Sequence, residues 1–410
     1  MERRVQIELA QRLLHYLEHP SACLAGDVSY NDKTIYTAPA QHAAEQGALF
    51  RRHPLVAGFT CQLREPGDFV TGDLAGVPLL LVRGRDGEAR AFRNVCRHRG
   101  AAVVEADCGR HGQSFACPYH GWVYNLEGRL VSMPDKGFGF GGVETDALGL
   151  LPLPAAERHG LVWVLPEGVG APDIDAYLGP LGQELAGFGF ADYHHFQTVT
   201  RRPAVNWKLV SDGFWEAYHL KVLHKRTIEP ILDGRVMAFD AFGRHHRMAV
   251  PRRTLEELRT VPQGDWDVLP RVIVLYGLFP NTVFALQGDH VEVTRIFPGR
   301  QPGECTVHFS LFTPEAVTTD SARDHWQRNL ELLLATVEQE DFRVAQRIQA
   351  GAEAGEPRWQ LIGRYEPALA HFHRILRLAL GQPADLWPPA GDALAAGPGG
   401  RANAKPRRVG

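Results

Sequence analysis

The sequence of 410 residues lacks any long hydrophobic run. No stretch reaches the roughly 18 apolar residues that a transmembrane helix needs. Residues 1–20 also lack the continuous apolar segment of a secretory signal peptide. They instead place Val5, Leu9, Leu13 and Leu17 at roughly helical spacing, which predicts an amphipathic helix docked on the fold. We therefore expect a cytoplasmic protein without a membrane partner.

The sequence also lacks an excess of charge of either sign. It has 44 Lys and Arg against 47 Asp and Glu, a net charge of −3. This balance does not indicate nucleic acid as a partner. Charged residues make up 22% and hydrophobic residues 44%, which is typical of a globular protein. The length exceeds that of one small domain and suggests two.

Cysteine is scarce, with six residues in the chain. Disulfides are not expected in a chain of this length without a secretion signal, and clustering with histidine favours metal binding. Cys61 and Cys305 each stand alone, and Cys108 lies between the two segments that combine cysteine with histidine, where a third thiolate ligand is conceivable. We interpret them as core, loop or surface residues and not as ligands.

Periodicity divides the chain into a β-rich first half and a mixed second half. Short runs at 79–82, 89–95 and 160–165 predict strands, the first two as a hairpin. In the second half, residues 206–224 should be largely helical. An antiparallel meander should follow, with strands at 271–279, 282–287, 290–297 and 305–312. Two later helices are expected at 320–350 and 366–380.

These patterns predict an α+β protein with four parts. They are an N-terminal helical segment (1–44), a β domain (45–165), an α+β domain (166–381), and a tail (382–410). Pro, Gly and Ala dominate the tail, which we expect to be largely disordered.

Two short motifs in the β domain contain closely spaced metal ligands. They read CRHRG, with Cys96 and His98, and CPYHGW, with Cys117 and His120. Two Cys and two His can hold a tetrahedral zinc ion or a [2Fe–2S] cluster, and spacing alone does not decide between them. Gly100 and Gly121 allow tight loops whose N–H groups can approach the cluster sulfides, which favours the cluster.

The two motifs resemble the ligand loops of the Rieske cluster in the large (alpha) subunit of ring-hydroxylating oxygenases. The resemblance implies that Cys96 and Cys117 bind one iron and that His98 and His120 bind the other. A structural zinc site is the alternative reading.

A second constellation lies in residues 206–227, NWKLVSDGFWEAYHLKVLHKRT. His219 and His224 are five residues apart, so an ideal helix would place them roughly 140° apart around its axis. Both can bind one metal only if the helix ends or unwinds between them. Non-haem iron oxygenases use two His and one carboxylate. Asp341 is the candidate carboxylate, with Glu340 and Glu338 as alternatives.

This stretch resembles the iron-binding segment of the same family. The resemblance implies that His219, His224 and Asp341 bind a mononuclear Fe(II). It also implies that Glu216 bridges a cluster histidine on one subunit to an iron-ligating histidine on its neighbour, within a homotrimer. The implied fold is a Rieske β domain followed by a helix-grip catalytic domain, an antiparallel sheet wrapping a long helix.

The resemblance further implies a terminal oxygenase that uses O2 and electrons from NAD(P)H. A ferredoxin or flavin reductase would deliver these electrons. Four arginines surround the cluster loops and form either a docking face for this partner or solvated loop residues: Arg93, Arg97, Arg99 and Arg110. Mono- or dioxygenation and oxidative N- or O-demethylation use the same metals. The rival class is an electron-transfer protein without catalytic iron.

We expect the substrate pocket to be lined from residues 225–315. An aromatic or similarly apolar substrate is favoured by six aromatic residues of the second domain: Phe239, Phe242, Tyr276, Phe279, Phe284 and Phe297. The pairs His194–His195 and His245–His246 are expected on the surface or in loops. The basic segment 244–253 is expected to be an exposed loop.

Overall fold

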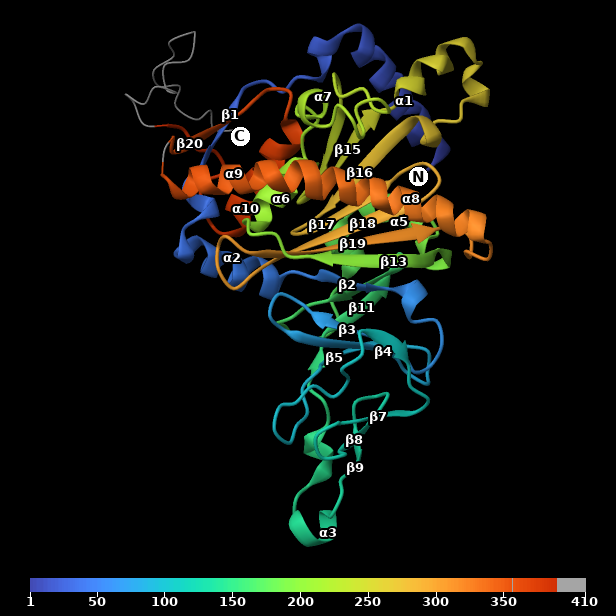
Figure 1. Cartoon of the computed structure of the whole chain (residues 1–410), viewed down its shortest axis with the longest axis vertical. Coiled ribbons are helices and arrows are strands. Elements are labelled where there is room, and N and C mark those ends of the chain that lie inside the picture. Colours follow the sequence, from blue (N-terminus) through green and yellow to red (C-terminus); the bar gives the residue numbers. More distant parts are fainter. Residues whose placement is uncertain (356, 389–410) are drawn as a thin grey trace.

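Seven antiparallel strands form the central sheet of the second half of the chain in this computed structural model. It describes residues 1–355 and 357–388. The sheet is built from alternating apolar segments and wraps around a long helix (Figure 1). In spatial order its strands are β13 (His194–Arg201), β19 (Cys305–Thr313), β18 (Val291–Pro298), β17 (Thr282–Leu286), β16 (Val272–Leu278), β15 (His245–Pro251) and β14 (Ala238–Phe242).

The long helix crosses one face of this sheet. It consists of α8 (Asp320–Thr336), a π-helical turn (Val337–Asp341) and α9 (Phe342–Glu353). Its buried residues, among them Leu330 and Phe342, face the sheet, as the helical periodicity predicts. Further helices on this side are α6 (Trp207–Phe214), α7 (Leu220–Leu223), α10 (Pro367–Ala379) and α2 (Pro39–Arg52).

The other face of the sheet packs against the N-terminal helix α1 (Arg3–Glu18) and the short helices α4 (Ile174–Leu178) and α5 (Pro180–Ala186). Leu9 and Leu13 of α1 are buried there, so the predicted amphipathic N-terminal helix is confirmed. A two-stranded ribbon of β1 (Ser29–Asp32) and β20 (Trp359–Ile362) lies beside α10.

A narrow β arm projects from this part of the molecule (Figure 1). The short helix α3 (Lys136–Gly139) lies at its far end. Three small sheets build the arm, because frequent Gly and Pro limit each strand to a few residues. Their strands, in spatial order, are β10 (Pro152–Leu153), β5 (Ala89–Arg93), β4 (Pro78–Arg83), β3 (Asp68–Asp73) and β6 (Cys108–Arg110); β7 (Ser114–Ala116), β8 (Val123–Asn125) and β9 (Leu130–Ser132); and β11 (Ala155–Arg158), β12 (Leu161–Val164) and β2 (Leu55–Phe59).

The predicted α+β fold, with its β domain first and an antiparallel sheet around a long helix, is confirmed. The hairpin of β4 and β5 is also confirmed. The predicted tail falls mostly on residues 389–410, which lie outside the described residues.

The prediction that residues 244–253 form an exposed loop is wrong. This segment is β15, in which every residue from His245 to Pro251 is buried. Burial is possible because Arg247 forms ion pairs with Asp240 and Glu184, so its charge is compensated inside the fold. The two histidine pairs were expected on the surface or in loops, and this prediction is also wrong because both pairs lie in strands of the sheet. His245 and His246 are buried in β15, and His194 and His195 are half-buried at the start of β13.

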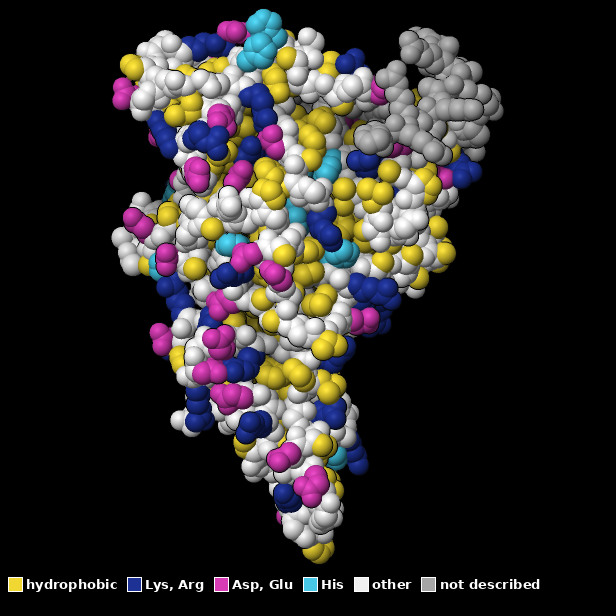
Figure 2. Space-filling model, turned by 180° about the vertical axis from the view of Figure 1, so that it is seen from behind, with side chains coloured by type: hydrophobic (Ala, Val, Ile, Leu, Met, Phe, Trp, Pro, Cys, Tyr) yellow, Lys and Arg dark blue, Asp and Glu magenta, His cyan; other side chains and the backbone are white. Residues whose placement is uncertain are grey.

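Among the described residues, none of the helices combines the length and apolarity that a bilayer crossing requires. Figure 2 shows the reverse side of the molecule, on which basic and acidic side chains are intermingled from the broad part down to the arm. This pattern agrees with the small net charge of −3.

Candidate metal centres and substrate pocket

The two ligand loops of the arm share one backbone pattern. In the first loop the N–H of Gly100 donates to the carbonyl of Cys96, whose own N–H donates to Ala101. In the second loop the N–H of Gly121 donates to Cys117, whose N–H donates to Trp122. Both glycines have positive φ angles, +80° and +69°, which residues with a Cβ rarely adopt. Glycine at these two positions therefore allows each loop to turn tightly behind its cysteine.

The side chains of the two loops converge. The Nδ1 atoms of His98 and His120 lie 3.1 Å apart, and His120 is exposed. Cys96 and Cys117 are buried beneath them, with 4% and 3% of their surface exposed. Two thiolates on the inner side and two imidazoles on the outer side are the donor set of a Rieske [2Fe–2S] cluster, so the residues fit that group.

Neighbouring side chains fix the first loop. The Tyr124 hydroxyl accepts from the Arg97 N–H at 3.0 Å and lies 3.3 Å from Cys96 Sγ. The Asn94 amide bonds the backbone of Val103 and Val104 across the loop. Protein groups alone therefore brace this loop.

At the second site, the predicted helix over 206–224 is interrupted. Helix α6 ends at Phe214, and α7 is a single turn flanked by His219 before it and His224 after it. This interruption is the condition that the five-residue spacing required. It allows both imidazoles to point to one place.

The structure brings His219, His224 and Asp341 together. The distance from His219 Nε2 to His224 Nε2 is 3.0 Å, and Asp341 Oδ1 lies 3.1 Å from His224 Nε2 and 3.8 Å from His219 Nε2. One ion can contact all three atoms at about 2 Å, a usual distance for divalent metals bound by His and carboxylate. Two His and one carboxylate fit a mononuclear Fe(II) and leave its other coordination positions open.

Carboxylates hold the second nitrogen of each imidazole. Glu216 Oε1 contacts His219 Nδ1, and Glu340 Oε2 lies 2.7 Å from His224 Nδ1. Such contacts fix the ring orientation and leave Nε2 free for a metal. Glu338, the other alternative ligand, instead forms an ion pair with Arg201 at 2.8 Å. Sequence reasoning did not predict the contact of Glu340 with His224.

The π-helical turn explains how two consecutive acids reach this site. Glu340 and Asp341 both belong to the wider turn, Val337–Asp341. In an α-helix consecutive side chains diverge by about 100°, whereas a π-turn locally shifts the register. Such turns occur frequently at functional sites.

The iron-site residues favour positive charge at this position. Burial lowers the pKa of His224, but the nearby Asp341 and Glu340 carboxylates raise it further, so the net shift is upward. This electrostatic preference is the one that a divalent cation would satisfy.

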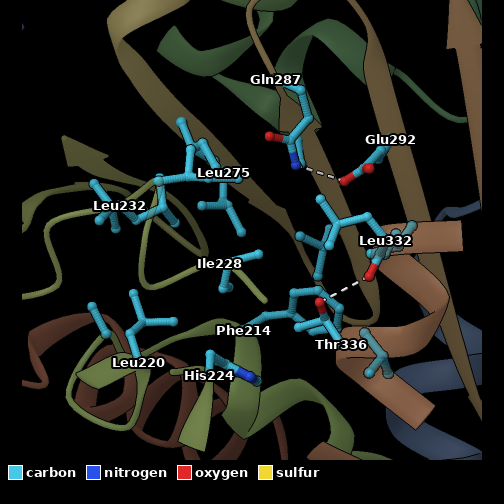
Figure 3. Close-up of a pocket in the computed structure, with 18 of the residues that line it drawn as sticks. Phe214, Leu220, His224, Ile228, Leu232, Leu275, Gln287, Glu292, Leu332 and Thr336 are labelled. Atoms are coloured by element: carbon cyan, nitrogen blue, oxygen red, sulfur yellow. Dashed lines mark hydrogen bonds between the residues drawn. The ribbon is translucent and has the colours of Figure 1, made fainter. Parts of the chain in front are cut away.

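A cavity of about 500 Å³ opens from this site. Figure 3 shows His224 at one end of it and the pair Gln287 and Glu292 at the other, with aliphatic side chains between them. This size is usual for a small-molecule site. Aliphatic residues dominate the walls: Leu220, Ile228, Ile231, Leu232, Met248, Val250, Ile273, Leu275, Val283, Leu332, Leu333 and Val337.

The expected lining from 225–315 is therefore partly right, because α6, α7 and the long helix also contribute. The six aromatic residues that favoured an aromatic or similarly apolar substrate do not contribute to this lining. All of them pack in the hydrophobic cores or against them. Phe214 is the one aromatic ring other than histidine among the described residues that line it.

A smaller cavity of about 180 Å³ lies on the other side of Asp341, between α6, α9 and α10. Glu366 lines it, and burial, followed by the charge of Glu216, raises the Glu366 pKa to about 7. Sequence reasoning did not single out Glu366 as a site residue.

Two family models match consecutive parts of the chain. Residues 53–139 match the Rieske [2Fe-2S] domain, and residues 190–382 match the catalytic domain of the ring-hydroxylating alpha subunit. The first match contains all four cluster-site residues and the second contains the iron-site triad. The chain belongs to the Rieske non-haem iron oxygenase alpha subunits.

Relatives of this Rieske chain include named oxygenases. It is 32% identical over 192 residues to the glycine betaine monooxygenase oxygenase subunit of Pseudomonas aeruginosa, covering 45% of the chain and 42% of that protein. It is 28% identical over 363 residues to the chloroplastic choline monooxygenase of Spinacia oleracea, covering 84% and 77%. A solved quaternary ammonium Rieske monooxygenase has the same fold, with a TM-score of 0.74 at 20% identity over 87% of this chain and 95% of that one.

Proposed function

We propose that this chain is a terminal oxygenase that hydroxylates an apolar small molecule with O2 and electrons from a partner protein. One observation carries the proposal: the triad of His219, His224 and Asp341 faces a cavity of about 500 Å³ lined mainly by aliphatic side chains. An electron-transfer protein has no use for such a cavity beside a second metal site.

Each part of the chain would have a separate role. Cys96, Cys117, His98 and His120 would hold the cluster, and His219, His224 and Asp341 would hold Fe(II). The two groups would supply one-electron transfer and O2 activation. Glu216 and Glu340 orient the imidazoles, and the aliphatic walls exclude water and position the substrate carbon.

Electrons would reach the iron site through Glu216 from the cluster of a neighbouring subunit in a homotrimer. Glu216 already contacts His219 and is partly exposed, at 15% of its side-chain surface. Exposed apolar residues lie close by: Tyr218 beside Glu216, and Val222 on α7. The exposed His120 and the neighbouring Tyr119 at the cluster would meet this surface.

A ferredoxin or flavin reductase would deliver electrons to the cluster, and these electrons would originate from NAD(P)H. Arg97 and Arg99 are exposed next to the cluster residues, which suits an acidic partner. Arg110 is less available, because it forms an ion pair with Asp68 at 2.6 Å.

The test is a count of iron and acid-labile sulfide in anaerobically purified protein, with EPR after reduction by dithionite. About three irons and two sulfides per chain with a Rieske signal are expected. About two irons that do not rise on reconstitution with Fe(II) would contradict a catalytic iron site. Zinc without sulfide would contradict the cluster as well.

A further inference from the structure

Arg252 lines the substrate cavity at the end away from the iron-site histidines. It follows β15 directly, and its Nη2 donates to the Gln287 carbonyl at 2.9 Å and lies 3.4 Å from Gln287 Oε1. Gln287 is at the far end of the cavity from His224 (Figure 3). A guanidinium therefore faces the cavity opposite the metal site.

This guanidinium forms no ion pair with any carboxylate in residues 1–355 and 357–388. Its Nε is buried without a hydrogen-bond partner. Burying a cation without a direct ion pair is unfavourable, and burial lowers the Arg252 pKa, although the charges of Asp289 and Glu292 partly oppose this shift. A bound anion would offset this cost.

The nearby carboxylates are committed to other groups. Glu292 accepts from Gln287 Nε2 at 2.7 Å and lies 3.4 Å from His290 Nε2. Asp289 contacts His290 Nδ1 at 2.7 Å and His325 at 3.2 Å. Asp289 and Glu292 raise the His290 pKa to about 9, so that a protonated His290 partly neutralises both of them. Arg252 is thus left as the cation that a ligand can pair with.

The rest of the cavity is poorly suited to a quaternary ammonium head group. Quaternary ammonium groups are usually recognised by several aromatic faces, yet Phe214 alone among the described lining residues provides a non-histidine ring. The walls between Gln287 and His224 are mainly aliphatic (Figure 3). They suit a hydrocarbon body.

We propose that the substrate is an amphipathic carboxylic acid whose carboxylate pairs with Arg252 and whose apolar body extends along the aliphatic walls to the triad. A guanidinium forms charge-assisted hydrogen bonds with a carboxylate, so Arg252 would be the specificity-determining residue for the head group. The oxidised carbon would then be remote from the carboxylate. This inference rests on the proposed function for its chemistry, but the binding preference can be tested separately.

The test uses matched probes and isothermal titration calorimetry on the metal-loaded protein without oxygen. The probes are the straight-chain acids of six to ten carbons, the corresponding primary alcohols, and the corresponding alkyltrimethylammonium ions. At least one acid should bind ~10-fold or more tightly than its matched alcohol, as expected for one charge-assisted pair. The ammonium probes should bind no better than the alcohols.

Arg252→Gln should reduce the acid-to-alcohol preference to about one while leaving alcohol binding and iron content unchanged. Arg252→Lys should retain part of the preference, which separates loss of charge from misfolding. Arg253→Gln is the matched control, because Arg253 pairs with Glu229 outside the cavity and should leave the preference intact.

The inference is overturned if no acid binds more tightly than its alcohol, if Arg252→Gln retains the preference, or if the ammonium probes bind best. Iron and sulfide counts on the same samples distinguish this failure from failure of the proposed function. Full metal content without an acid preference contradicts only the role of Arg252. An acid preference without the mononuclear iron contradicts only the oxygenase proposal.

Discussion

At the scale of single residues, the two iron-site histidines are held by different acids. Glu216 contacts His219 and lies near the surface, whereas Glu340 contacts the buried His224 and also accepts from Thr227 at 2.7 Å. The two carboxylates therefore have distinct consequences when they are replaced.

Glu216→Gln should keep both metal groups and lower the rate of substrate oxidation by at least about 10–100-fold. The amide preserves the packing but removes the charge that would link His219 to the cluster of the neighbouring subunit. Product formation and metal content measured on the same sample check this. Glu338→Gln is the matched control, since Glu338 pairs with Arg201 instead. Normal turnover in Glu216→Gln would refute the bridge.

Asp341→Ala should lower mononuclear iron occupancy and leave the cluster unaffected. The triad would lose its one carboxylate ligand, whereas Glu340 already bonds His224 and Thr227. Iron analysis together with EPR of the Rieske signal measures the two sites separately. Unchanged iron occupancy would transfer the ligand role to Glu340.

Tyr124→Phe should lower the reduction potential of the cluster. The Tyr124 hydroxyl accepts from Arg97 N–H and can therefore donate to Cys96 Sγ, which stabilises the more negative reduced state. Loss of one hydrogen bond of about 0.5–1.5 kcal/mol corresponds to roughly 20–65 mV for one electron. A spectroelectrochemical titration measures the change, and an unaltered potential would argue against the bond.

At the scale of elements, what the sequence reveals depends on regular periodicity. The strands of the meander and the long helix follow apolar spacing, and the ligand loops are short motifs whose residues lie close together in the chain. The π-turn, by contrast, has no periodic signal: Glu340 and Asp341 read as adjacent acids on one helix. The basic residues around β15 led to the wrong prediction of an exposed loop, because the ion pairs of Arg247 with Asp240 and Glu184 form only in the folded chain.

Arg252 could not have been assigned from sequence for a related reason. Its position opposite the triad depends on the pairing of β15 with β16 and of β16 with β17, which places Gln287 beside it. These contacts are long-range, and a basic segment gives no indication of the cavity that it borders.

Deletion of Gln339 should convert the π-turn to α-helix, which removes the wider turn that brings both Glu340 and Asp341 to the histidines. Gln339 is exposed, so little packing is lost. We expect unchanged helix content by circular dichroism, an intact Rieske signal and loss of the mononuclear iron. The substitution Gln339→Ala keeps the turn and should keep the iron; retention of iron in the deletion variant would show that the turn is dispensable.

At the scale of the whole molecule, the cluster loops lie in the narrow arm, whereas the triad lies in the broad part, where α7 and the long helix are found (Figure 1). This arrangement is the physical reason for proposing transfer between neighbouring subunits in a ring.

Complementation between two inactive variants tests that arrangement. Cys96→Ser removes a cluster ligand, and Asp341→Ala removes the carboxylate of the iron site. Co-expressed at equal levels, the two chains should regain roughly one quarter of wild-type activity, because one in four directed neighbour pairs joins an intact cluster to an intact iron site. Each variant expressed alone should be inactive. Absence of recovery in verified mixed trimers would refute transfer between subunits.

The triad also joins two distant parts of the chain, since the histidines flank α7 and the acid belongs to the π-turn. An ion held by all three would cross-link the segment before β14 to the helix that covers the sheet. Binding to the folded chain alone would then raise its melting temperature by mass action. Thermal unfolding with increasing Fe(II) would become a measure of site occupancy that needs neither a substrate nor an electron donor.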